Sequence, residues 1–513
     1  MAAMTIQDIN LWLGRIAPGA QLASDSRRIL PGNVFFAYPG TAADGRNFIA
    51  SAIARGAVAV LYDVQDFAWN EAWKVPHLGL DALKKIAGPV AHAFYAMPDA
   101  AMFSVGVTGT NGKTSCAVWL GQALSRLGLA TAVIGTLGVG LFKARSQVAF
   151  DVTGYTTPDA ILLARKLAEA RAAGVVALAI EVSSIGLDQE RVDGMHFDVA
   201  LFTNLTRDHL DYHGEMEAYE AAKTRLFDWP GLKSAVLNLD DPMGLRLVGH
   251  VKDGLGAQFP VFGYTLADIG AQPEIDGVAI LRASQLRSRH GGTDFHLESP
   301  FGTALVKTQL VGQFNISNVL GVMGALLAKG IPLRAVIEAI ESLTPAPGRM
   351  QQVGGHDAPM VVIDYAHTPD ALEKTLLTLR QVAVERGGQV WCVFGCGGER
   401  DAGKRPQMGA IAQIAERVLV TSDNPRGEDP HRIIEQIVAG MNQNNPNSAL
   451  QTVEDRAAAI LLAVKHAANA DVILLAGKGH ESYQEIKGKK LPFSDADHAA
   501  LALAARATKM RTN

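Results

Sequence analysis

Short apolar runs separated by helical patterns make up the first part of the chain. Residues 34–37 and 57–61 are continuous apolar runs typical of strands, and residues 48–55 have the spacing of a helix. Strands that alternate with helices favour an α/β fold. We therefore predict a small α/β domain in residues 1–97, a unit whose own sequence does not reveal a ligand.

In the middle of the chain, longer apolar runs each end in polar residues. Residues 102–107 lead into a glycine-rich loop, residues 174–180 end at Glu181, and residues 199–202 lead into a polar stretch that contains His209. Buried strands of a parallel sheet are continuous apolar runs, and their carboxyl ends form the ligand crevice of open α/β sheets. We therefore expect Glu181 and His209 to lie at one site with the glycine-rich loop.

The pattern changes between residues 253 and 311, where apolar and polar positions alternate. Such alternation is typical of antiparallel strands, and Gly291-Gly292 is the predicted hairpin turn. Residues 313–329 are a predicted helix, and Pro332 starts another. The Pro- and Gly-rich residues 344–348 then form a predicted linker and hinge.

The last part of the chain repeats the arrangement of apolar runs that end in polar or glycine residues. The runs are residues 360–363, 390–394, 418–421 and 472–476. Helical patterns separate them, so we predict a second doubly wound parallel sheet. The predicted fold class is therefore α/β with three domains, in residues 1–97, 98–345 and 346–513.

Composition narrows the function classes by exclusion. The 513 residues have a net charge of −4 and are 48% hydrophobic, which argues against a nucleic-acid-binding polycation. The cysteines Cys116, Cys392 and Cys396 make no disulfide framework, and we expect Cys392 and Cys396 to be buried thiols. The chain lacks an apolar run of about 18 residues and a signal-peptide pattern, so we expect a cytoplasmic protein without a membrane span.

The glycine-rich loop has the sequence Thr108-Gly109-Thr110-Asn111-Gly112-Lys113-Thr114, and a helical pattern follows it. A glycine loop between a strand and a helix that begins with Lys-Thr is typical of phosphate-binding loops. Val107 stands where the usual G-x-x-x-x-G-K-[ST] spacing has its first glycine. We expect the loop N–H groups and Lys113 to bind phosphates and Thr114 to ligate magnesium. The alternative is an ordinary glycine turn.

Three further residues in the middle of the chain are candidates for metal chemistry to different degrees. Glu181 could hold magnesium, although a surface carboxylate at a strand end is the alternative. His209 could ligate a second metal, although a lone histidine is more often structural. Lys223 lies in a helical pattern, and the pattern alone favours a surface lysine.

Charged residues follow the strands of the last domain. Arg400, Lys404 and Arg405 come after a glycine pair, and Arg426 follows a neighbouring strand. Guanidinium groups bind carboxylates through two hydrogen bonds. Together with the carboxylates of Asp423 and Glu481, these groups could bind a zwitterion, and a solvated salt-bridge network is the equal alternative.

Taken together, these motifs resemble those of the Mur ligase family nearly from end to end. The characteristic stretches are Thr108 to Thr114, Glu181-Val182-Ser183-Ser184, Asn204 to Gly214, and Asp364-Tyr365-Ala366-His367-Thr368-Pro369. In addition, Asp423-Asn424-Pro425-Arg426 resembles the signature of family members that add meso-diaminopimelate.

The resemblance implies an ATP-dependent ligase that adds meso-2,6-diaminopimelate to UDP-N-acetylmuramoyl-L-alanyl-D-glutamate through an acyl phosphate. It also implies a role in peptidoglycan synthesis, and hence in cell shape and cell division. The three domains would be a UDP-substrate-binding domain (1–97), an ATP-binding domain with a phosphate loop (98–345) and a Rossmann-like amino-acid-binding domain (346–513). We expect a monomer.

The resemblance further assigns roles to single residues. The ATP-binding residues would be Gly109, Thr110, Asn111, Gly112, Lys113, Thr114, Ser115, Asn315, Asn318, Arg349, Asp364 and His367. The UDP-substrate would contact Ser26, Thr41, Ala42, Ala43, Thr156, Thr157, Ser183, Gln189 and Arg191. The amino acid would contact Arg400, Asp423, Asn424, Pro425, Arg426, Gly477 and Glu481.

The implied catalytic and metal-binding residues overlap with these sets. The catalytic residues would be Lys113, Lys223 and His209, and the Mg²⁺ ligands Thr114, Glu181, His209 and Lys223. In the family, the lysine that matches Lys223 is carbamylated by CO2. The resemblance thus gives Lys223 a functional role that its helical pattern alone does not suggest.

Two other classes of protein remain as alternatives. One is a related ligase, such as a folylpolyglutamate or cyanophycin synthetase, against which the Asp423–Arg426 signature and the N-terminal α/β unit argue. The other is a nucleotide-dependent switch or motor, which would hydrolyse ATP without needing a carboxylate and an amine.

Overall fold

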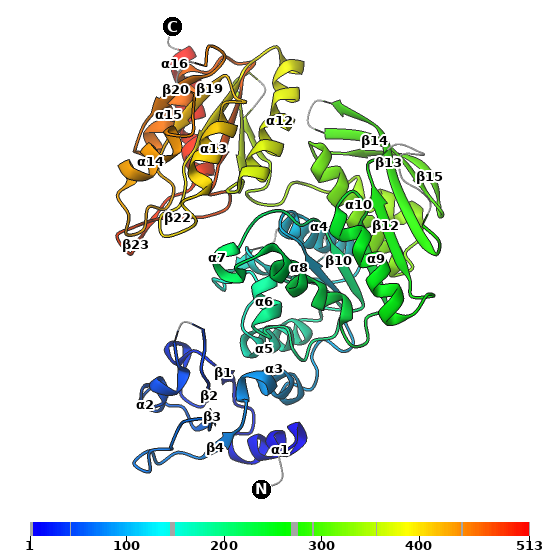
Figure 1. Cartoon of the computed structure of the whole chain (residues 1–513), viewed down its shortest axis with the longest axis vertical. Coiled ribbons are helices and arrows are strands. Elements are labelled where there is room, and N and C mark those ends of the chain that lie inside the picture. The colour runs from blue at the N-terminus through cyan, green and yellow to red at the C-terminus, as the bar shows by residue number, and fades with distance from the viewer. Residues whose placement is uncertain are drawn as a thin grey trace.

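The computed structural model places three sheet-centred units one after another along the chain (Figure 1). It describes residues 4–41, 43–143, 149–267, 275–289, 292–354, 357–442 and 445–511. Residues 509–511 are described without their side chains. The first unit lies at one end of the molecule, the last lies at the other, and the largest sheet lies between them. This order agrees with the predicted three-domain α/β fold.

Within the described residues, the N-terminal unit has a four-stranded parallel sheet. Its strands, in spatial order, are β1 (Leu22–Ala23), β2 (Val34–Ala37), β3 (Ala59–Asp63) and β4 (His77–Leu80). Its helices are α1 (Ile6–Ile16), α2 (Ile49–Ala54) and α3 (Leu83–Phe94). The strands predicted at 34–37 and 57–61 and the helix predicted at 48–55 are confirmed.

The central unit has an eleven-stranded sheet in the part of the chain that the structure describes. The strands, in spatial order, are β15 (Gly302–Thr308), β14 (Gly292–Ser299), β13 (Val278–Arg289), β12 (Val261–Thr265), β11 (Ser234–Asn238), β10 (Val199–Phe202), β5 (Phe103–Thr108), β9 (Ala177–Glu181), β6 (Thr131–Gly135), β7 (Gly138–Phe142) and β8 (Phe150–Asp151). The strands from β13 to β6 in this order are parallel, and the strands at both margins are antiparallel.

Helices cover both faces of this sheet because its strands are apolar on both sides. In β9, Ala177 and Ala179 belong to one core cluster, and Leu178 and Ile180 belong to the other. This alternation follows from the two-residue period of a strand. The main covering helices are α4 (Lys113–Arg126) and α10 (Gln313–Ala328) in the first cluster, and α5 (Ala160–Ala172) and α9 (Pro242–Leu255) in the second.

The segment at residues 253–311, expected to form antiparallel strands, differs from its prediction in two respects. Its first strand, β12, is parallel to both of its neighbours, β11 and β13. Residues 253–255 still belong to α9, and the first strand of the segment begins only at Val261. The hairpin predicted between β13 and β14 is confirmed, with Gly292 at the start of β14. Gly291 lies outside the described residues. The predicted helices at 313–329 and after Pro332 are α10 and α11 (Leu333–Ile340).

The C-terminal unit has a six-stranded sheet within the described residues. Its spatial order is β16 (Gln351–Gly354), β17 (Met360–Asp364), β21 (Val472–Ala476), β18 (Val390–Phe394), β19 (Arg417–Val420) and β20 (Ala449–Thr452). β16 is antiparallel to β17 and the other pairs are parallel, which confirms the second doubly wound sheet. Its helices are α12 (Pro369–Arg386), α13 (Lys404–Ala412), α14 (Pro430–Val438), α15 (Arg456–His466) and α16 (Asp495–Arg511).

A small hairpin, β22 (Tyr483–Ile486) and β23 (Lys489–Pro492), follows β21 and was not foreseen from the sequence. The cysteines Cys116, Cys392 and Cys396 are buried free thiols, as predicted for the latter two. In the described part of the chain, the helices lack the combination of length and apolarity that a membrane crossing requires.

The register of the central strands brings their carboxyl ends to one level. Val107 of β5 pairs with Glu181 of β9, and Thr108 pairs with Phe202 of β10. The glycine-rich loop therefore leaves the sheet beside Glu181 and beside the polar stretch that begins at Thr203.

A buried ion pair holds the C-terminal unit together. Arg456 donates to the carboxylate of Asp495 through Nε (2.8 Å) and Nη2 (2.7 Å), and both side chains are fully buried. Nη2 also donates to the carbonyl of Ala476 (2.9 Å), the last residue of β21. The pair therefore joins α15, α16 and the end of a central strand.

Replacing Arg456 by alanine should destabilise the C-terminal unit by about 3–5 kcal/mol, because it leaves the carboxylate of Asp495 buried without a partner. Urea unfolding followed by tryptophan fluorescence, with Trp391 in this sheet, measures the effect. Arg334→Ala is the control, since the Arg334–Glu338 pair is exposed and such pairs contribute about 1 kcal/mol or less. Equal urea midpoints for the two variants would contradict a stabilising role of Arg456.

Candidate active site

The glycine-rich loop joins β5 to α4, and two of its glycines are required by close contacts. Gly109 has φ +145°, and a Cβ there would lie 1.9 Å from Oγ1 of Thr203. Gly112 has φ +87°, and a Cβ there would lie 2.5 Å from Oδ1 of Asn318. L-residues rarely adopt such φ values, so glycine lets the backbone turn into the helix. Thr114 and Ser115 are buried in the first turn of α4.

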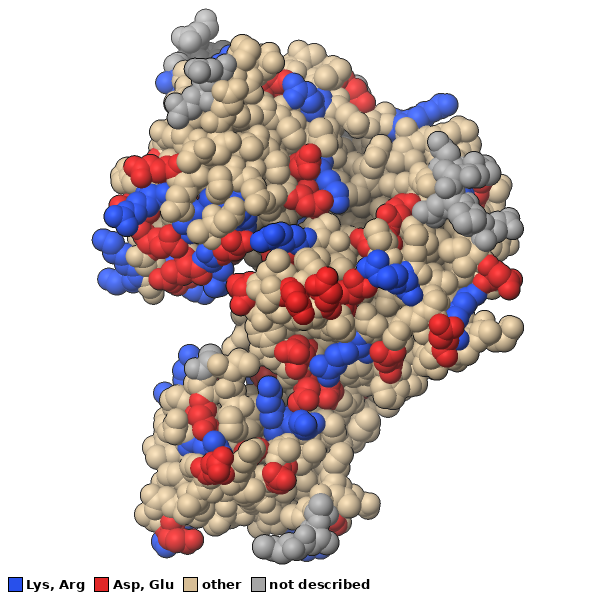
Figure 2. Space-filling model, in the orientation of Figure 1, with Lys and Arg blue, Asp and Glu red and all other residues tan. Residues whose placement is uncertain are grey.

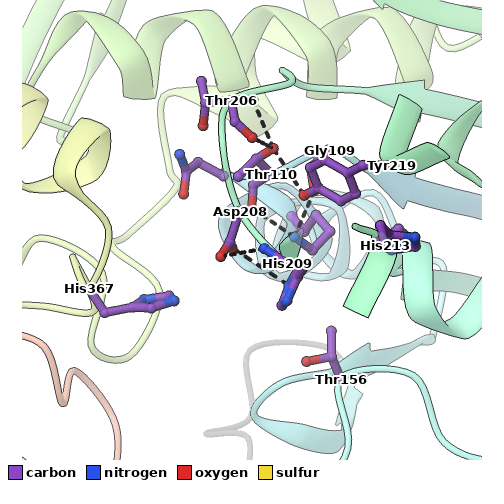
Figure 3. A network of polar contacts seen from close by, with 12 residues as sticks. Gly109, Thr110, Thr156, Thr206, Asp208, His209, His213, Tyr219 and His367 are labelled. Carbon is purple, nitrogen blue, oxygen red and sulfur yellow. Dashed lines mark hydrogen bonds and ion pairs between the residues drawn. The ribbon is translucent and has the colours of Figure 1, made fainter. Parts of the chain in front are cut away.

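A polar network fixes this loop to the segment after β10. The N–H of Thr110 donates to the carbonyl of Asn204 (2.7 Å), and the N–H of Asn111 donates to Oδ1 of Asn204 (2.9 Å). Figure 3 shows the hydroxyl of Thr110 between Thr206 and Tyr219, at 3.1 Å from the Thr206 carbonyl and 3.1 Å from the Tyr219 hydroxyl. The loop is therefore held in shape by its own protein neighbours.

Two lysine side chains converge on the carbonyl of Gly109. Lys113 Nζ donates to it at 2.8 Å and to the carbonyl of Thr110 at 2.9 Å. Lys223 Nζ, from α8 (Met216–Thr224), donates to the Gly109 carbonyl at 3.1 Å. Burial lowers the pKa of Lys113. The loop thus gathers two amines at the place where phosphate oxygens are expected.

Lys223 is not a surface residue, so the interpretation from its helical pattern alone is wrong. It is 1% exposed, and its Nζ lies 4.2 Å from the ring centroid of Tyr219. Burial, and then the charge of Lys113, lower its pKa well below the ordinary value. These conditions favour the neutral amine.

Glu181 is 2% exposed, so it is not a surface carboxylate either. Its Oε1 accepts from the N–H of Thr136 (2.8 Å) and its Oε2 accepts from the Thr136 hydroxyl (3.2 Å). Gly135 allows this approach, since a Cβ there would lie 2.1 Å from Oε1. Thr156, predicted at the UDP-substrate, bonds to the Thr136 hydroxyl at 3.1 Å and so lies beside Glu181.

His209 lies on the other side of the loop, in a strained backbone conformation with φ +54°. Its N–H donates to Oδ1 of Asp208 (2.9 Å), and its ring Nε2 lies 3.6 Å from Oδ2. Burial lowers the pKa of the imidazole, which favours its neutral form. Sequence reasoning gave Asp208 and Tyr219 no role, although Asp208 belongs to the quoted motif and Tyr219 precedes Lys223 by one helical turn.

A second group of predicted residues forms a connected network beside Glu181. The Thr157 hydroxyl donates to the backbone carbonyl of Glu181 (2.8 Å) and lies 3.0 Å from Oγ of Ser183. Arg191 donates to the carbonyl of Thr157 (2.9 Å) and, through Nη2, to Oε1 of Gln189 (2.7 Å). Ser183 also caps α6 (Ser184–Asp188).

The same network reaches the N-terminal unit through Gln189. Its side-chain amide donates to Oγ1 of Thr41 (3.4 Å) and to the hydroxyl of Tyr212 (3.2 Å). Ala43 lies in the same loop as Thr41, while Ala42 lies outside the described residues. Ser26 is 8% exposed in a short 3-10 turn, and no contact of its side chain joins it to this network in the described structure.

Residues of the C-terminal unit approach the glycine-rich loop from the far side. Arg349 donates to the hydroxyl of Thr114 (3.2 Å) and stacks over the ring of Tyr365 (4.4 Å to the centroid). Asn111 donates through Nδ2 to the carboxylate of Asp370 (3.2 Å) in the first turn of α12. The C-terminal unit therefore contacts the loop through two side chains of the loop itself.

The other predicted nucleotide residues line this junction. Asn315 and Asn318 are buried in α10, with Asn318 against Gly112. Asp364 accepts from the N–H of Met350 (2.8 Å), and burial raises its pKa. Burial, and then Lys404, lower the pKa of His367 to about 4. Figure 3 shows His367 pointing from the C-terminal unit toward Asp208.

At the C-terminal sheet, the predicted amino-acid site contains a buried charged cluster. Asn424 donates to Oε2 of Glu481 (2.8 Å), and Lys478 donates to Oε2 (2.9 Å) and to Oδ1 of Asn424 (3.2 Å). Lys478 is fully buried and was not singled out from the sequence, although it stands between Gly477 and Glu481. Burial raises the pKa of Asp423, which packs against Gly477.

The arginines of this region have different roles. Arg426 donates through Nη1 to the carbonyl of Gly398 (2.7 Å). Arg400 is exposed and contacts the carbonyl of Glu399. Arg405 is 1% exposed and binds Glu428 and Gln436, so it forms a structural salt bridge, which is buried and not part of a solvated network. The carbonyl of Pro425 accepts from the N–H of Glu428 (3.0 Å) and packs against Gly398.

The linker at residues 344–348 passes very close to the loop at residues 477–481, which follows β21. Gly348 has φ +65°, and a Cβ there would lie 2.1 Å from the backbone N of His480. Gly479 has φ +53°, and a Cβ there would lie 2.8 Å from the carbonyl O of Gly348. The segment before Arg349 and the segment before Glu481 are thus in direct backbone contact.

The arrangement brings together a phosphate-sized loop, two lysines, and oxygen and nitrogen donors from Thr114, Glu181 and His209. No cluster of three or more His, Cys, Asp or Glu side chains placed to bind a metal occurs among the residues that the structure describes. A metal here would therefore need the Thr114 hydroxyl, phosphate oxygens or a modified side chain among its ligands.

Three family models match consecutive parts of the chain. The model described as Mur ligase family, catalytic domain, matches residues 20–95. The Mur ligase middle domain matches residues 107–326, and the Mur ligase, glutamate ligase domain, matches residues 348–479.

Full-length relatives agree with these matches. The chain is 63% identical over 495 residues to the UDP-N-acetylmuramoyl-L-alanyl-D-glutamate–2,6-diaminopimelate ligase of Janthinobacterium sp. (strain Marseille), and the match covers 96% of each chain. It is 51% identical over 503 residues to the protein of the same name from Ralstonia nicotianae, with 96% and 95% of the two chains covered. A solved structure of that ligase name is 33% identical with a TM-score of 0.64, covering 96% of this chain and 99% of the other. The chain therefore belongs to the Mur ligase family.

Proposed function

We propose that this protein is an ATP-dependent ligase that joins meso-2,6-diaminopimelate to UDP-N-acetylmuramoyl-L-alanyl-D-glutamate in peptidoglycan synthesis. One observation carries the proposal: a relative named for this reaction is 63% identical over 96% of both chains. The contacts of the central unit with both outer units support it, since the reaction brings three substrates together: the phosphate loop contacts Asp370 and Arg349, and Gln189 contacts Thr41. We further propose a cytoplasmic monomer with roles in cell shape and cell division.

The division of labour follows the three units. We propose that residues 1–97 bind the UDP part, residues 98–345 bind ATP, and residues 346–513 bind the amino acid. The Gln189 contact with Thr41 supports the first assignment, because it links a predicted substrate residue of the central unit to the N-terminal loop. Thr157, Ser183 and Arg191 would hold the dipeptide beside Glu181.

The nucleotide would bind along the glycine-rich loop. The N–H groups from Gly109 to Thr114 and the amine of Lys113 would neutralise charge on the phosphates. Arg349 would lie at the same end of the loop, because it already contacts Thr114. Asn315, Asn318, Asp364 and His367 would enclose the rest of the nucleotide.

Magnesium fits the donor set around the loop. The hydroxyl of Thr114, the carboxylate of Glu181 and the neutral imidazole of His209 are the groups that would hold it. When bound, the ion screens the repulsion between phosphate and carboxylate, two anions that must meet. Glu181 already accepts two hydrogen bonds from Thr136, which orient its carboxylate.

Lys223 fits the same site as a carbamate. A neutral amine attacks CO2, an N–C bond forms, one proton is released, and the product is a carboxylate. The lowered pKa of Lys223 supplies the neutral amine at neutral pH, and its burial beside Tyr219 excludes competing water. We propose that the carbamate is a further magnesium ligand.

The chemical sequence then follows from the positions of these groups. The γ-carboxylate of D-glutamate attacks the terminal phosphorus of ATP, and ADP leaves as Lys113 and the loop N–H groups stabilise the charge. The amine of diaminopimelate attacks the acyl phosphate, and the tetrahedral intermediate expels phosphate to form the amide. Residues 344–348 would act as the hinge that brings the amine to the acyl group.

An ADP-release assay tests the proposed function. We expect rapid ADP formation only when the UDP-muramoyl-dipeptide and meso-diaminopimelate are both present. Lys113→Ala should lower the rate by about 10²–10³-fold, because a group that stabilises the transferring phosphate is lost. ATP turnover that is indifferent to both substrates would instead favour a nucleotide-dependent switch.

The carbamate has its own test. Lys223→Ala should lose at least about tenfold of the activity, the scale of defects in groups that orient a metal site, and short carboxylic acids should restore part of it. Depleting the buffer of CO2 should slow the wild type, and bicarbonate should reverse this, while Lys223→Ala should respond to neither. Lys252→Ala, a change in α9 outside the site, is the control. Wild-type rates that ignore CO2, combined with an active Lys223→Ala variant, would refute the carbamate.

A further inference from the structure

The hairpin formed by β22 and β23 packs along the Asp423–Arg426 loop and fixes it. Gln484 donates through Nε2 to the carbonyl of Asp423 (2.7 Å). The N–H of Glu485 donates to Oδ1 of Asn424 (2.9 Å), and the N–H of Arg426 donates to the carbonyl of Glu485 (3.0 Å). The predicted amino-acid loop is therefore bordered by a hairpin that its own signature does not include.

Within this border, Arg426 and Glu485 form an ion pair. Nε of Arg426 lies 3.6 Å from Oε2 of Glu485, with side chains 20% and 25% exposed. Arg426 has φ +52°, a strained conformation for a non-glycine residue that persists only where neighbours enforce it. The hairpin does so through main-chain contacts with Arg426, so the side chain of Glu485 is not needed to hold the loop.

The surface around this pair carries both signs of charge. Figure 2 shows Lys and Arg beside Asp and Glu over the part of the C-terminal unit where Figure 1 places β22 and β23. Glu481 differs from Glu485, because Oε2 of Glu481 already accepts from the buried Lys478 and from Asn424. Asp423 is buried and accepts from the N–H of Asn424. Glu485 is thus the partly exposed carboxylate that contacts Arg426.

A paired guanidinium and carboxylate are complementary to a zwitterion. In an α-amino acid, the nitrogen and the carboxyl carbon are bonded to the same carbon and lie about 2.5 Å apart. Both groups can therefore reach the pair together, the carboxylate at Nη2 of Arg426 and the ammonium at Glu485. A lone carboxylate would meet the negative charge of Glu485, and a lone ammonium would meet Arg426.

We propose that Glu485 is a specificity-determining residue of the amino-acid site, which with Arg426 selects substrates whose far end carries both a carboxylate and an ammonium. The proposal rests on the proposed function and adds a residue outside the Asp423–Arg426 signature. Arg426 alone attracts any carboxylate. The discrimination against substrates that lack the second ammonium comes from Glu485.

The test compares two amino acids that differ by one group. meso-Diaminopimelate carries the far ammonium, and 2-aminopimelate lacks it. Glu485→Gln keeps the size and the main-chain contacts of the residue and removes its charge. We expect the KM for meso-diaminopimelate to rise about tenfold, the scale of a lost hydrogen bond to a charged group. The KM for 2-aminopimelate should stay level or fall, and kcat with meso-diaminopimelate should remain within about twofold.

Two further variants separate specificity from structure. Glu454→Gln removes a carboxylate of the same unit, one that pairs with the exposed His431. For this variant, the ratio of the KM values for the two amino acids should equal that of the wild type. Glu485→Asp should restore part of the preference, because it restores the charge. A Glu485→Gln variant that changes both KM values equally, or neither, would overturn the proposal.

Failure of the proposed function appears in a different arm of the experiment. Wild-type protein that turns over neither amino acid with the UDP-muramoyl-dipeptide would refute the proposed reaction before any variant is compared. In that case, calorimetry with the whole protein measures the Kd for meso-diaminopimelate and for 2-aminopimelate. The ratio of the two Kd values then decides the role of Glu485. An unchanged Kd ratio in Glu485→Gln would overturn it.

Discussion

The carbonyl of Gly109 is the point on which the central site depends, because two lysines donate to it. Two ammonium groups on one buried carbonyl repel each other, and the Coulomb energy between them rises as water is excluded. The repulsion is relieved when one amine gives up its proton, and Lys223 is the more deeply buried of the two. Burial and the charge of Lys113 thus set the protonation state of Lys223 and, in the proposed reaction, its chemistry. Gly109 must be glycine for the same carbonyl to point there, since Thr203 fills the space of a side chain.

The glycine-rich loop also contacts the C-terminal unit. Asn111 and Thr114 contact Asp370 and Arg349 of the C-terminal unit. The placement of that unit and, in the proposed reaction, nucleotide binding therefore involve the same side chains. In the proposed reaction, the strand ends next to the loop would serve the other substrate. There, Thr157 bonds to the backbone of Glu181, and Arg191 links Thr157 to Gln189.

The sequence predicted the central strands well because parallel strands buried on both faces are continuous apolar runs, as in residues 199–202. Their carboxyl ends then placed Glu181 and His209 correctly beside the loop. The pattern failed for Lys223, because α8 is short and polar and its burial comes from tertiary contacts with Tyr219 and the loop. The pattern also failed to separate Arg405 from Arg426. Spacing alone does not show that Arg405 forms a buried ion pair with Glu428, whereas Arg426 is the proposed substrate contact. The β22–β23 hairpin, with four residues in each strand, is too short for a clear alternation.

The close contact of Gly348 with Gly479 couples the linker at residues 344–348 to the loop at residues 477–481. Because the two backbones are in direct contact, a rotation at residues 344–347 would carry Arg349 and Glu481 together. A segment that is swapped between related ligases therefore has to include the linker as well as the C-terminal sheet. A chimaera that is meant to import a new amino-acid specificity has to be joined before Thr344, so that the linker and the loop come from the same parent.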